Sequence, residues 1–269
     1  MEAARTFAAN NRSLIVNVLY LAVAAVALYY IYKFLMGGDS SFTILGGESD
    51  GAGAPKEIPL PGATTRIQTG GEYTLSFWMY ITSWDMRFGK AKSVLQITDS
   101  GLPEYSLLTT ILYPNDPRMM IRVHTDAGGA AGDDVNNLTA YNALMNNTAP
   151  SMSMDSPMCD LVDIDLQRWI NVTVSVNGRI VDVYYDGKLA RSCVLPKVPV
   201  ASDNGQQVVS FGKGTGFAGK LSNIQFFPYP LTPDAIYSLY MAGPRKGAGF
   251  LTYLLEKLGI KITYDDKKN

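Results

Sequence analysis

The chain of 269 residues carries 23 Lys and Arg against 24 Asp and Glu, so its formal net charge is -1. A near-neutral chain lacks the basic field that nucleic acid binding requires, and we exclude nucleic acid as a partner. The content of 25 Gly and 14 Pro, with 11% aromatic residues, is typical of an all-β domain with many turns. One histidine and two cysteines offer little for a zinc site. Whether Cys159 and Cys193 form a disulfide stays open.

Residues 13–32 contain no charged side chain. A helix of about 20 residues spans about 30 Å, the thickness of the hydrocarbon core of a bilayer. We predict a transmembrane helix over residues 13–36, after a short N-terminal tail, 1–12. A signal peptide has a shorter apolar run, and a buried core helix would show a polar face. The side chains expected in the bilayer are Leu14, Ile15, Val18, Leu19, Leu21, Val23, Val26, Leu28, Tyr29, Tyr30, Ile31 and Tyr32.

Charged residues on the two sides of this segment predict its orientation. Arg5 and Arg12 precede it, whereas Asp39 and Glu48 follow it. The positive-inside tendency then keeps the N-terminus inside and places the large domain on the outer or lumenal side. Lys33, at the far end of the span, weakens this asymmetry. In a virus particle, the same orientation would place the domain between membrane and capsid.

Residues 37–64 are rich in Gly, Ser, Asp and Pro, and we predict a linker there, with Phe42–Leu45 as a short apolar island suited to an edge strand. From residue 65 onward, runs of aromatic and β-branched residues recur at short spacing, which indicates a β-sandwich or barrel. The expected strands are 73–81, 92–98, 105–113, 118–125, 169–176, 180–185, 189–195, 208–212 and 220–227.

Three short signals mark the connections between these strands. Asn177-Gly178 and Asp186-Gly187 predict two-residue hairpin turns of type I′. The glycine-rich run GKGTGFAG before the last strand predicts a tight turn that uses positive φ. Residues 126–158 contain few strand formers and are too long for a hairpin loop. They are either a functional surface loop or a tolerated insertion.

Helix signals occur near the C-terminus. Thr232, followed by Pro233 and Asp234, has the pattern of an N-cap, a proline at the first helical position and an acidic first turn. Residues 244–269 are expected to form a helical appendage and tail. The apolar side of that appendage favours docking, either on an assembly partner or on the sandwich itself.

Three sequence blocks together resemble laminin-G-like domains. EYTLSFWMYITSW resembles an early strand of those domains, and QRWINVTVSVNGRIVDVYYDGKLARSC resembles their central meander. FGKGTGFAGKLSNIQFFPYPLTPDAIYSLYMAG resembles their closing strand and the short helix after it. The blocks cover about residues 65–243. The resemblance implies the concanavalin A-like jelly-roll, an all-β sandwich of two antiparallel sheets, here with an N-terminal transmembrane helix and short C-terminal helices.

The concanavalin A-like group includes glucanases, whose catalytic strand resembles Glu-x-Asp-x-Glu. The nearest string here is Asp163-Ile-Asp165, which lacks both glutamates. His124 is the only histidine, and no serine has the glycine pattern of a nucleophile elbow. We therefore predict that the protein is not an enzyme.

Two kinds of binding residue are candidates. Laminin-G-like domains often bind Ca²⁺ through loop aspartates, and calcium is the one cofactor that the resemblance implies. The candidate calcium ligands, which alternatively are solvated turn formers, are Asp126, Asp133, Asp134, Asp155 and Asp160. The candidate aromatic platform for a sugar, which alternatively is core or edge packing, consists of Trp84, Tyr105, Tyr113 and Tyr141.

These features predict a membrane-anchored, non-catalytic sandwich that binds glycan or protein ligands at a surface. The alternative is a structural protein that tethers a membrane to an outer layer, such as a minor capsid protein of a large DNA virus with an inner membrane. The expected partners are the lipid bilayer, a glycan or protein ligand, and an assembly partner bound through the C-terminal helix.

Overall fold

The computed structural model describes residues 16–17, 20–28, 42–60, 71–99, 106–125, 138–146, 159–199, 207–211 and 215–244. The chain divides into two units, Met1–Ser40 and Ser41–Asn269. In the first unit, residues 20–28 are helical and exposed. Among the described residues, no helix combines the length and the apolar character needed to cross a membrane. The anchor residues outside the described ranges are Leu14, Ile15, Val18, Leu19, Tyr29, Tyr30, Ile31 and Tyr32.

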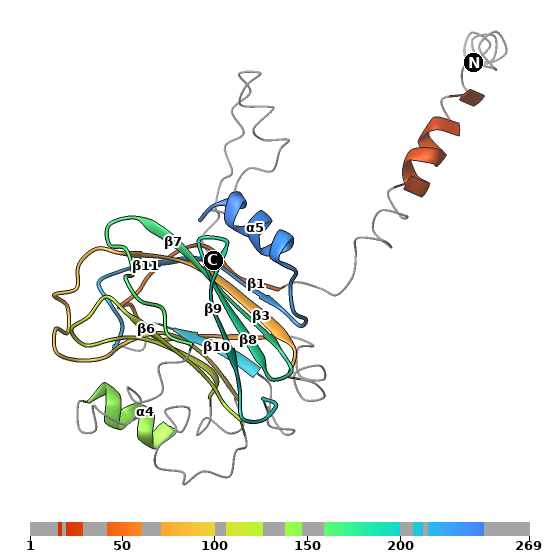
Figure 1. Cartoon of the computed structure of the whole chain (residues 1–269). Helices are drawn as coiled ribbons and strands as arrows, with labels where there is room; N and C mark the ends of the chain where they lie inside the picture. Colours follow the sequence, from red (N-terminus) through yellow and green to blue (C-terminus); the bar gives the residue numbers. More distant parts are fainter. Residues whose placement is uncertain are drawn as a thin grey trace, which may run out of the picture. The chain divides into compact units, whose positions relative to one another are not determined.

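The second unit contains two antiparallel sheets packed face to face (Figure 1). The six-stranded sheet has the order β1 (Phe42–Asp50), β11 (Gly219–Phe227), β3 (Tyr73–Ile81), β7 (Trp169–Asn177), β8 (Ile180–Tyr185) and β9 (Lys188–Val194). The five-stranded sheet has the order β2 (Lys56–Pro59), β10 (Gln207–Phe211), β4 (Lys92–Asp99), β5 (Ser106–Leu112) and β6 (Met119–Val123). This arrangement confirms the predicted all-β sandwich and is consistent with a jelly-roll.

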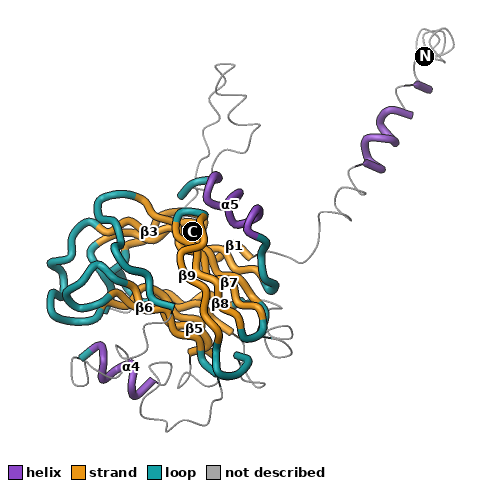
Figure 2. The backbone as a smooth tube through the Cα atoms, in the orientation of Figure 1, coloured by secondary structure: helices purple, strands orange, loops and turns teal. Residues whose placement is uncertain are grey.

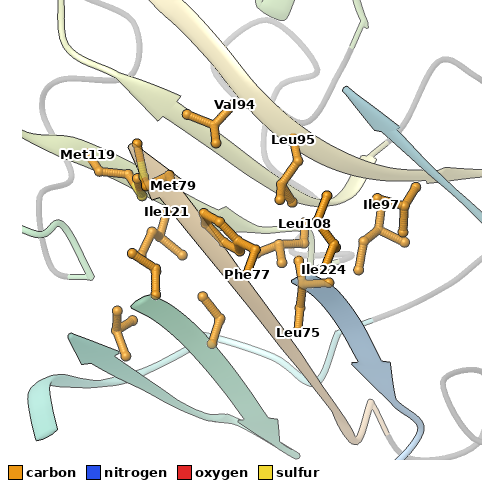
Figure 3. Close-up of a cluster of buried hydrophobic side chains, with 14 of the residues drawn as sticks. Leu75, Phe77, Met79, Val94, Leu95, Ile97, Leu108, Met119, Ile121 and Ile224 are labelled. Atoms are coloured by element: carbon orange, nitrogen blue, oxygen red, sulfur yellow. The ribbon is translucent and has the colours of Figure 1, made fainter. Parts of the chain in front are cut away.

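The main core lies between the two sheets (Figure 3). Leu75, Phe77 and Met79 alternate along β3 and point toward the five-stranded sheet, which contributes Ile97 and Leu108. All five side chains are fully buried. Alternate residues of a strand face opposite sides of the sheet. The buried side chains of β3 that face the other sheet therefore recur at every second position of the sequence.

The outer face of the six-stranded sheet is covered in part by α5 (Pro233–Ala242). Ile236 of α5 is buried, and the Tyr240 ring of the same helix stacks on Trp78 of β3 with 5.7 Å between ring centroids. The Thr232 side chain accepts a hydrogen bond from the Ala235 N–H at 3.4 Å, as predicted for the N-cap.

The outer face of the five-stranded sheet carries a second helix, α4 (Leu138–Met145). Tyr141, Leu144 and Met145 pack with Ile111 of β5 and Met120 of β6 in a separate buried cluster. The segment 126–158, expected as a loop or insertion, therefore contains a helix that covers a sheet face. Eight residues are too few to show helical periodicity clearly, so the sequence pattern missed α4.

The predicted linker, residues 37–64, is wrong over residues 42–59. These residues form β1 and β2, each of which is an edge strand of its sheet. Edge strands tolerate glycine and charge that central strands do not. The register of β1 against β11 shifts between Leu45 and Glu48, where two glycines lie. The sandwich therefore begins at Phe42 rather than at residue 65.

Of the two predicted type I′ turns, the first is wrong and the second is confirmed. The β7–β8 loop consists of Gly178 and Arg179, because Asn177 still pairs with Ile180. Only Gly178 has positive φ, at 57°, which is the pattern of a type II′ rather than a type I′ turn. The Asp186-Gly187 turn has positive φ at both residues, as type I′ requires.

The described glycines of the GKGTGFAG run have a different role from the predicted one. Gly216 and Gly219 do not have positive φ. A Cβ at Gly216 would lie 1.8 Å from the Gly51 carbonyl oxygen, and a Cβ at Gly219 would lie 2.0 Å from that of Tyr80. Close backbone approach therefore requires these glycines.

Cys159 and Cys193 form a disulfide, with 5.9 Å between their Cα atoms. The bond ties the end of the 126–158 segment to edge strand β9. It resolves the pairing that the sequence left open.

Candidate functional site

One end of the sandwich carries three long connections, which we call the loop rim: residues 82–91, 113–118 and 159–168. They join β3 to β4, join β5 to β6 and lead into β7. Backbone bonds hold them together, from the Ile164 N–H to the Pro117 carbonyl at 2.8 Å and from the Gln167 N–H to the Ile81 carbonyl at 2.7 Å. Figure 2 shows these loops in teal, gathered at one end of the strands.

The 82–91 loop presents an aromatic side chain to solvent. The Phe88 N–H donates to the Asp85 carbonyl, and the Lys90 N–H donates to the Arg87 carbonyl. Arg87 and Gly89 both have positive φ, at 55° and 74°. Between these two turns, the Phe88 side chain is 67% exposed. Exposure of one aromatic ring on a tightly turned loop is a common feature of binding surfaces.

Lys92, at the start of β4, contacts two of the rim loops. Its Nζ donates to the carbonyls of Tyr113 and Pro114, at 3.4 and 3.0 Å, and lies 4.8 Å from the centre of the Trp84 ring. Lys92 itself is buried. Desolvation by burial, and then the nearby Arg87 guanidinium, lowers the pKa of Lys92 to about 8.

Asp160 is a buried anchor for the same region. Its carboxylate accepts a hydrogen bond from the Tyr113 hydroxyl at 2.5 Å and forms an ion pair with Arg122. Burial, and then the hydrogen bond to Asp160, raises the pKa of Tyr113 to about 12. The Arg118 guanidinium lies over the Tyr113 ring, 4.9 Å from its centre. A buried pair of this kind fixes geometry at little net gain in stability.

A second ion-pair network orders the 159–168 connection. Arg168 pairs with Asp165 and, at 2.7 Å, with Asp186 of the β8–β9 turn. The Tyr185 hydroxyl donates to Asp165 at 2.9 Å. The hydrogen bonds from Arg168 and Tyr185 lower the pKa of Asp165.

Two buried N–H donors at the loop rim have no acceptor in the described part of the chain. They are Trp84 Nε1 and Arg118 Nε. An unpaired buried donor costs about 1–3 kcal/mol, so such groups are rare and often mark a place where a ligand supplies the acceptor. The loop rim thus carries one exposed aromatic ring, that of Phe88, and two buried donors without an acceptor in the described residues.

The described aromatic candidates lie at this end of the sandwich, but most of them are packed inside. Tyr113 and Tyr141 belong to the buried cluster under α4. Trp84 is half-buried beside Lys92. Tyr105 lies outside the described residues. The packing alternative therefore holds for Tyr113 and Tyr141, while Trp84 remains a binding candidate.

Of the calcium candidates, the structure describes only Asp160. Its two carboxylate oxygens accept from the Tyr113 hydroxyl and the Arg122 guanidinium. Within the described ranges, no three His, Cys, Asp or Glu side chains gather as metal ligands. The candidates that lie outside those ranges are Asp126, Asp133, Asp134 and Asp155.

Sequence reasoning missed Phe88, Arg87 and Arg118. The string SWDMRFGKAK does place Phe88 among cations between two expected strands. That signal marks a loop, but only the register of the sheets puts this loop beside residues 113–118.

Residues 52–237 match the family model of the concanavalin A-like lectin/glucanases superfamily. The match covers more than half of the chain, which therefore belongs to that superfamily. No curated protein matches the sequence.

Solved structures with a similar fold include a sialidase from Trypanosoma rangeli, at 13% identity and a TM-score of 0.46, with 73% of this chain and 27% of that chain covered. Another is the ligand binding domain of Botulinum neurotoxin serotype D in complex with N-acetylneuraminic acid. It has 13% identity and a TM-score of 0.46, with 76% of this chain and 47% of that chain covered. The chain thus spans less than half the length of either structure, and we transfer no activity or ligand from them.

Proposed function

We propose that this protein is a membrane-anchored, non-catalytic module that binds a glycan through its loop rim. A protein ligand at the same rim is the alternative that the binding experiment tests. The observation that carries this proposal is the exposed Phe88 ring, on the same loop rim as the buried, acceptor-free donors of Trp84 and Arg118. Sugars present apolar ring faces and hydroxyl oxygens, which match an aromatic ring and N–H donors. Membership of a superfamily that includes lectins supports the same reading.

The carboxylates at the rim support a non-catalytic role. Glycoside hydrolysis by a carboxylate pair requires one carboxyl group that stays protonated as the general acid. Asp160 is paired with Arg122, and Asp165 with Arg168. The hydrogen bonds from Arg168 and Tyr185 lower the pKa of Asp165, so Asp165 does not suit the role of an acid catalyst.

Membrane anchoring through residues 13–36 and an outer or lumenal sandwich complete the proposal. The apolar segment and the charge asymmetry around it support this topology. The Cys159–Cys193 disulfide adds support, because disulfides persist in compartments that are oxidising. Retention of the full chain in membranes after alkaline extraction, and protection of the sandwich from protease added on the cytoplasmic side, test the topology.

Glycan array binding by the detergent-solubilised full chain tests the rim. We expect saturable binding to a subset of glycans, and roughly tenfold weaker binding for Phe88→Ala, because a stacked aromatic contact contributes about 1 kcal/mol or more. Trp84→Phe keeps an aromatic side chain but removes the Nε1 donor together with part of the indole, and we expect weaker binding here too.

The control for Phe88→Ala is Val194→Ala, since Val194 is 60% exposed on β9 and pairs with Ile180 beside the β7–β8 turn, at the end of the sheet opposite the loop rim. Its binding should equal that of the parent chain. Binding that is unchanged in Phe88→Ala would place the glycan site elsewhere. The absence of binding to any glycan, together with recovery of one partner in fixed stoichiometry, would replace the proposal by the structural alternative.

One observation favours that structural alternative. Tyr237 and Met241 of α5 and Leu189 of β9 are large apolar side chains with about half or more of their surface exposed. The helix contacts β9, so these residues form one apolar surface on the outer side of the six-stranded sheet. A protein that links a membrane to an outer layer would use such a surface. Crosslinking in native membranes, with Tyr237→Ser as the variant, tests it.

A further inference from the structure

The strand register shows which elements lie at the end of the six-stranded sheet opposite the loop rim. β1 begins at Phe42, which pairs with Phe226 near the end of β11. The same end holds the β7–β8 turn, because Tyr73 pairs with Val176 and Asn177 pairs with Ile180. The chain therefore enters the sandwich at the end that carries this turn.

This end carries an apolar and basic surface, which we call the entry patch: Arg179, Ile180, Val194, Lys197 and Val198. Ile180 and Val194 pair directly across β8 and β9 and are 47% and 60% exposed. Val198 is 42% exposed. The Arg179 backbone accepts from the Leu195 N–H and its Nε donates to the Leu195 carbonyl, at 2.7 and 2.8 Å, so the turn is held against Leu195.

The length of chain before β1 limits how far this end can lie from a bilayer. The expected span ends at residue 36, so residues 37–41 alone precede Phe42. Five residues reach about 18 Å when fully extended. A linker of the length first predicted, residues 37–64, would have allowed several times that distance.

We propose that the entry patch rests on the bilayer surface, with its apolar side chains at the headgroup boundary and its two cations against anionic lipid. This inference rests on the proposed anchoring. Exposed apolar residues flanked by Lys and Arg are the composition that binds membrane surfaces, because basic residues are attracted to anionic lipid headgroups. Such docking directs the loop rim away from the bilayer, by the length of the strands.

Quenching by brominated lipid tests the docking in the full chain reconstituted in nanodiscs that contain phosphatidylserine. Val194→Trp places a fluorophore in the patch. Leu189→Trp is the matched control, since Leu189 is also exposed, lies on the same strand and is about 17 Å farther along it. We expect brominated lipid to quench the added emission of Val194→Trp and to leave that of Leu189→Trp unchanged.

The cations are tested by adding Arg179→Glu and Lys197→Glu to Val194→Trp, which should reduce the quenching in anionic nanodiscs. Equal quenching in Val194→Trp and Leu189→Trp, or none in either, would overturn the docking and assign the patch to another occupant. Loss of the chain from membranes on alkaline extraction would instead refute the anchoring itself. The two failures are therefore distinguishable.

Discussion

At the scale of single residues, buried charge is the feature that most constrains the loop rim. Lys92 is buried, and its Nζ donates to backbone carbonyls instead of pairing with a carboxylate in the described part of the chain. Asp160 is also buried, but it has Arg122 as a partner. A buried ammonium is more costly than a buried ion pair, which is the reason that the pKa of Lys92 is lowered.

The lowered pKa of Lys92 predicts a pH dependence. The folded state releases the Lys92 proton near pH 8, whereas the unfolded chain keeps it until about pH 10.4. Between these values the unfolded state binds more protons, so the contribution of Lys92 to stability rises with pH. We expect the free energy of unfolding of the parent chain to rise relative to that of Lys92→Met between pH 8 and pH 10.

Urea denaturation of both chains at several pH values measures this difference. Parallel pH profiles for the two chains would show that Lys92 titrates normally in the fold. Below pH 8 the two profiles should run parallel in either case, because Lys92 is then charged in both states.

At the scale of elements, each sheet has a helix on its outer face, and the two helices differ in the strength of their sequence signals. α5 has an N-cap threonine, a proline at the first position and Gly243 at its C-terminal end with φ of 82°. α4 has no acidic residue in its first turn and no basic residue in its last. Arg87 compensates from outside the helix, because its Nη2 donates to the Met145 carbonyl at 2.8 Å.

Removal of the N-cap tests how much local signals contribute to α5. Thr232→Ala should lower the free energy of unfolding by about 1 kcal/mol, because the Ala235 N–H loses its side-chain acceptor. Ser238→Ala in the same helix is the control, and it should be neutral, since Ser238 bonds only to its own helix at Asp234. Chemical denaturation measures both, and equal effects would show that the cap adds nothing to α5.

At the scale of the whole molecule, the disulfide connects parts that strand pairing leaves apart. It joins two cysteines that are 34 residues apart in the chain, and so connects the end of the 126–158 segment to edge strand β9. β9 pairs only with β8, so its outer side has no neighbouring strand in the described sheet. The link therefore secures the edge that carries half of the entry patch.

Removing the disulfide should cost considerable stability. The double variant Cys159→Ser/Cys193→Ser should unfold at a free energy lower by about 4 kcal/mol, on the chain-entropy estimate for a loop of this size. Denaturation of the parent chain with and without reductant provides the comparison. If reduction shifts the parent but leaves the double variant unchanged, the loss is due to the bond; an equal shift in both would contradict this.

Local patterns in the sequence determined the strands, α5 and the class of fold. The nine strands expected from residue 73 onward correspond to β3 through β11. The alternation of apolar and polar residues and the turn residues between strands are local signals, so the sequence alone predicts them. Of the first two strands, only Phe42–Leu45 was expected as a short edge strand; the rest of β1 and all of β2 were missed, because their glycine and charge resemble a linker.

The tertiary structure alone decided where the functional surfaces lie. Tyr113 and Asp160 were singled out for separate roles, yet packing brings them together as buried partners, while Phe88 is left exposed. Which end of a sandwich a loop occupies depends on strand pairing between residues far apart in the chain, such as Tyr80 with Trp169 and Phe42 with Phe226. No local pattern encodes that pairing, because both faces of a strand and both ends of a sheet look alike until the partner strands are in place.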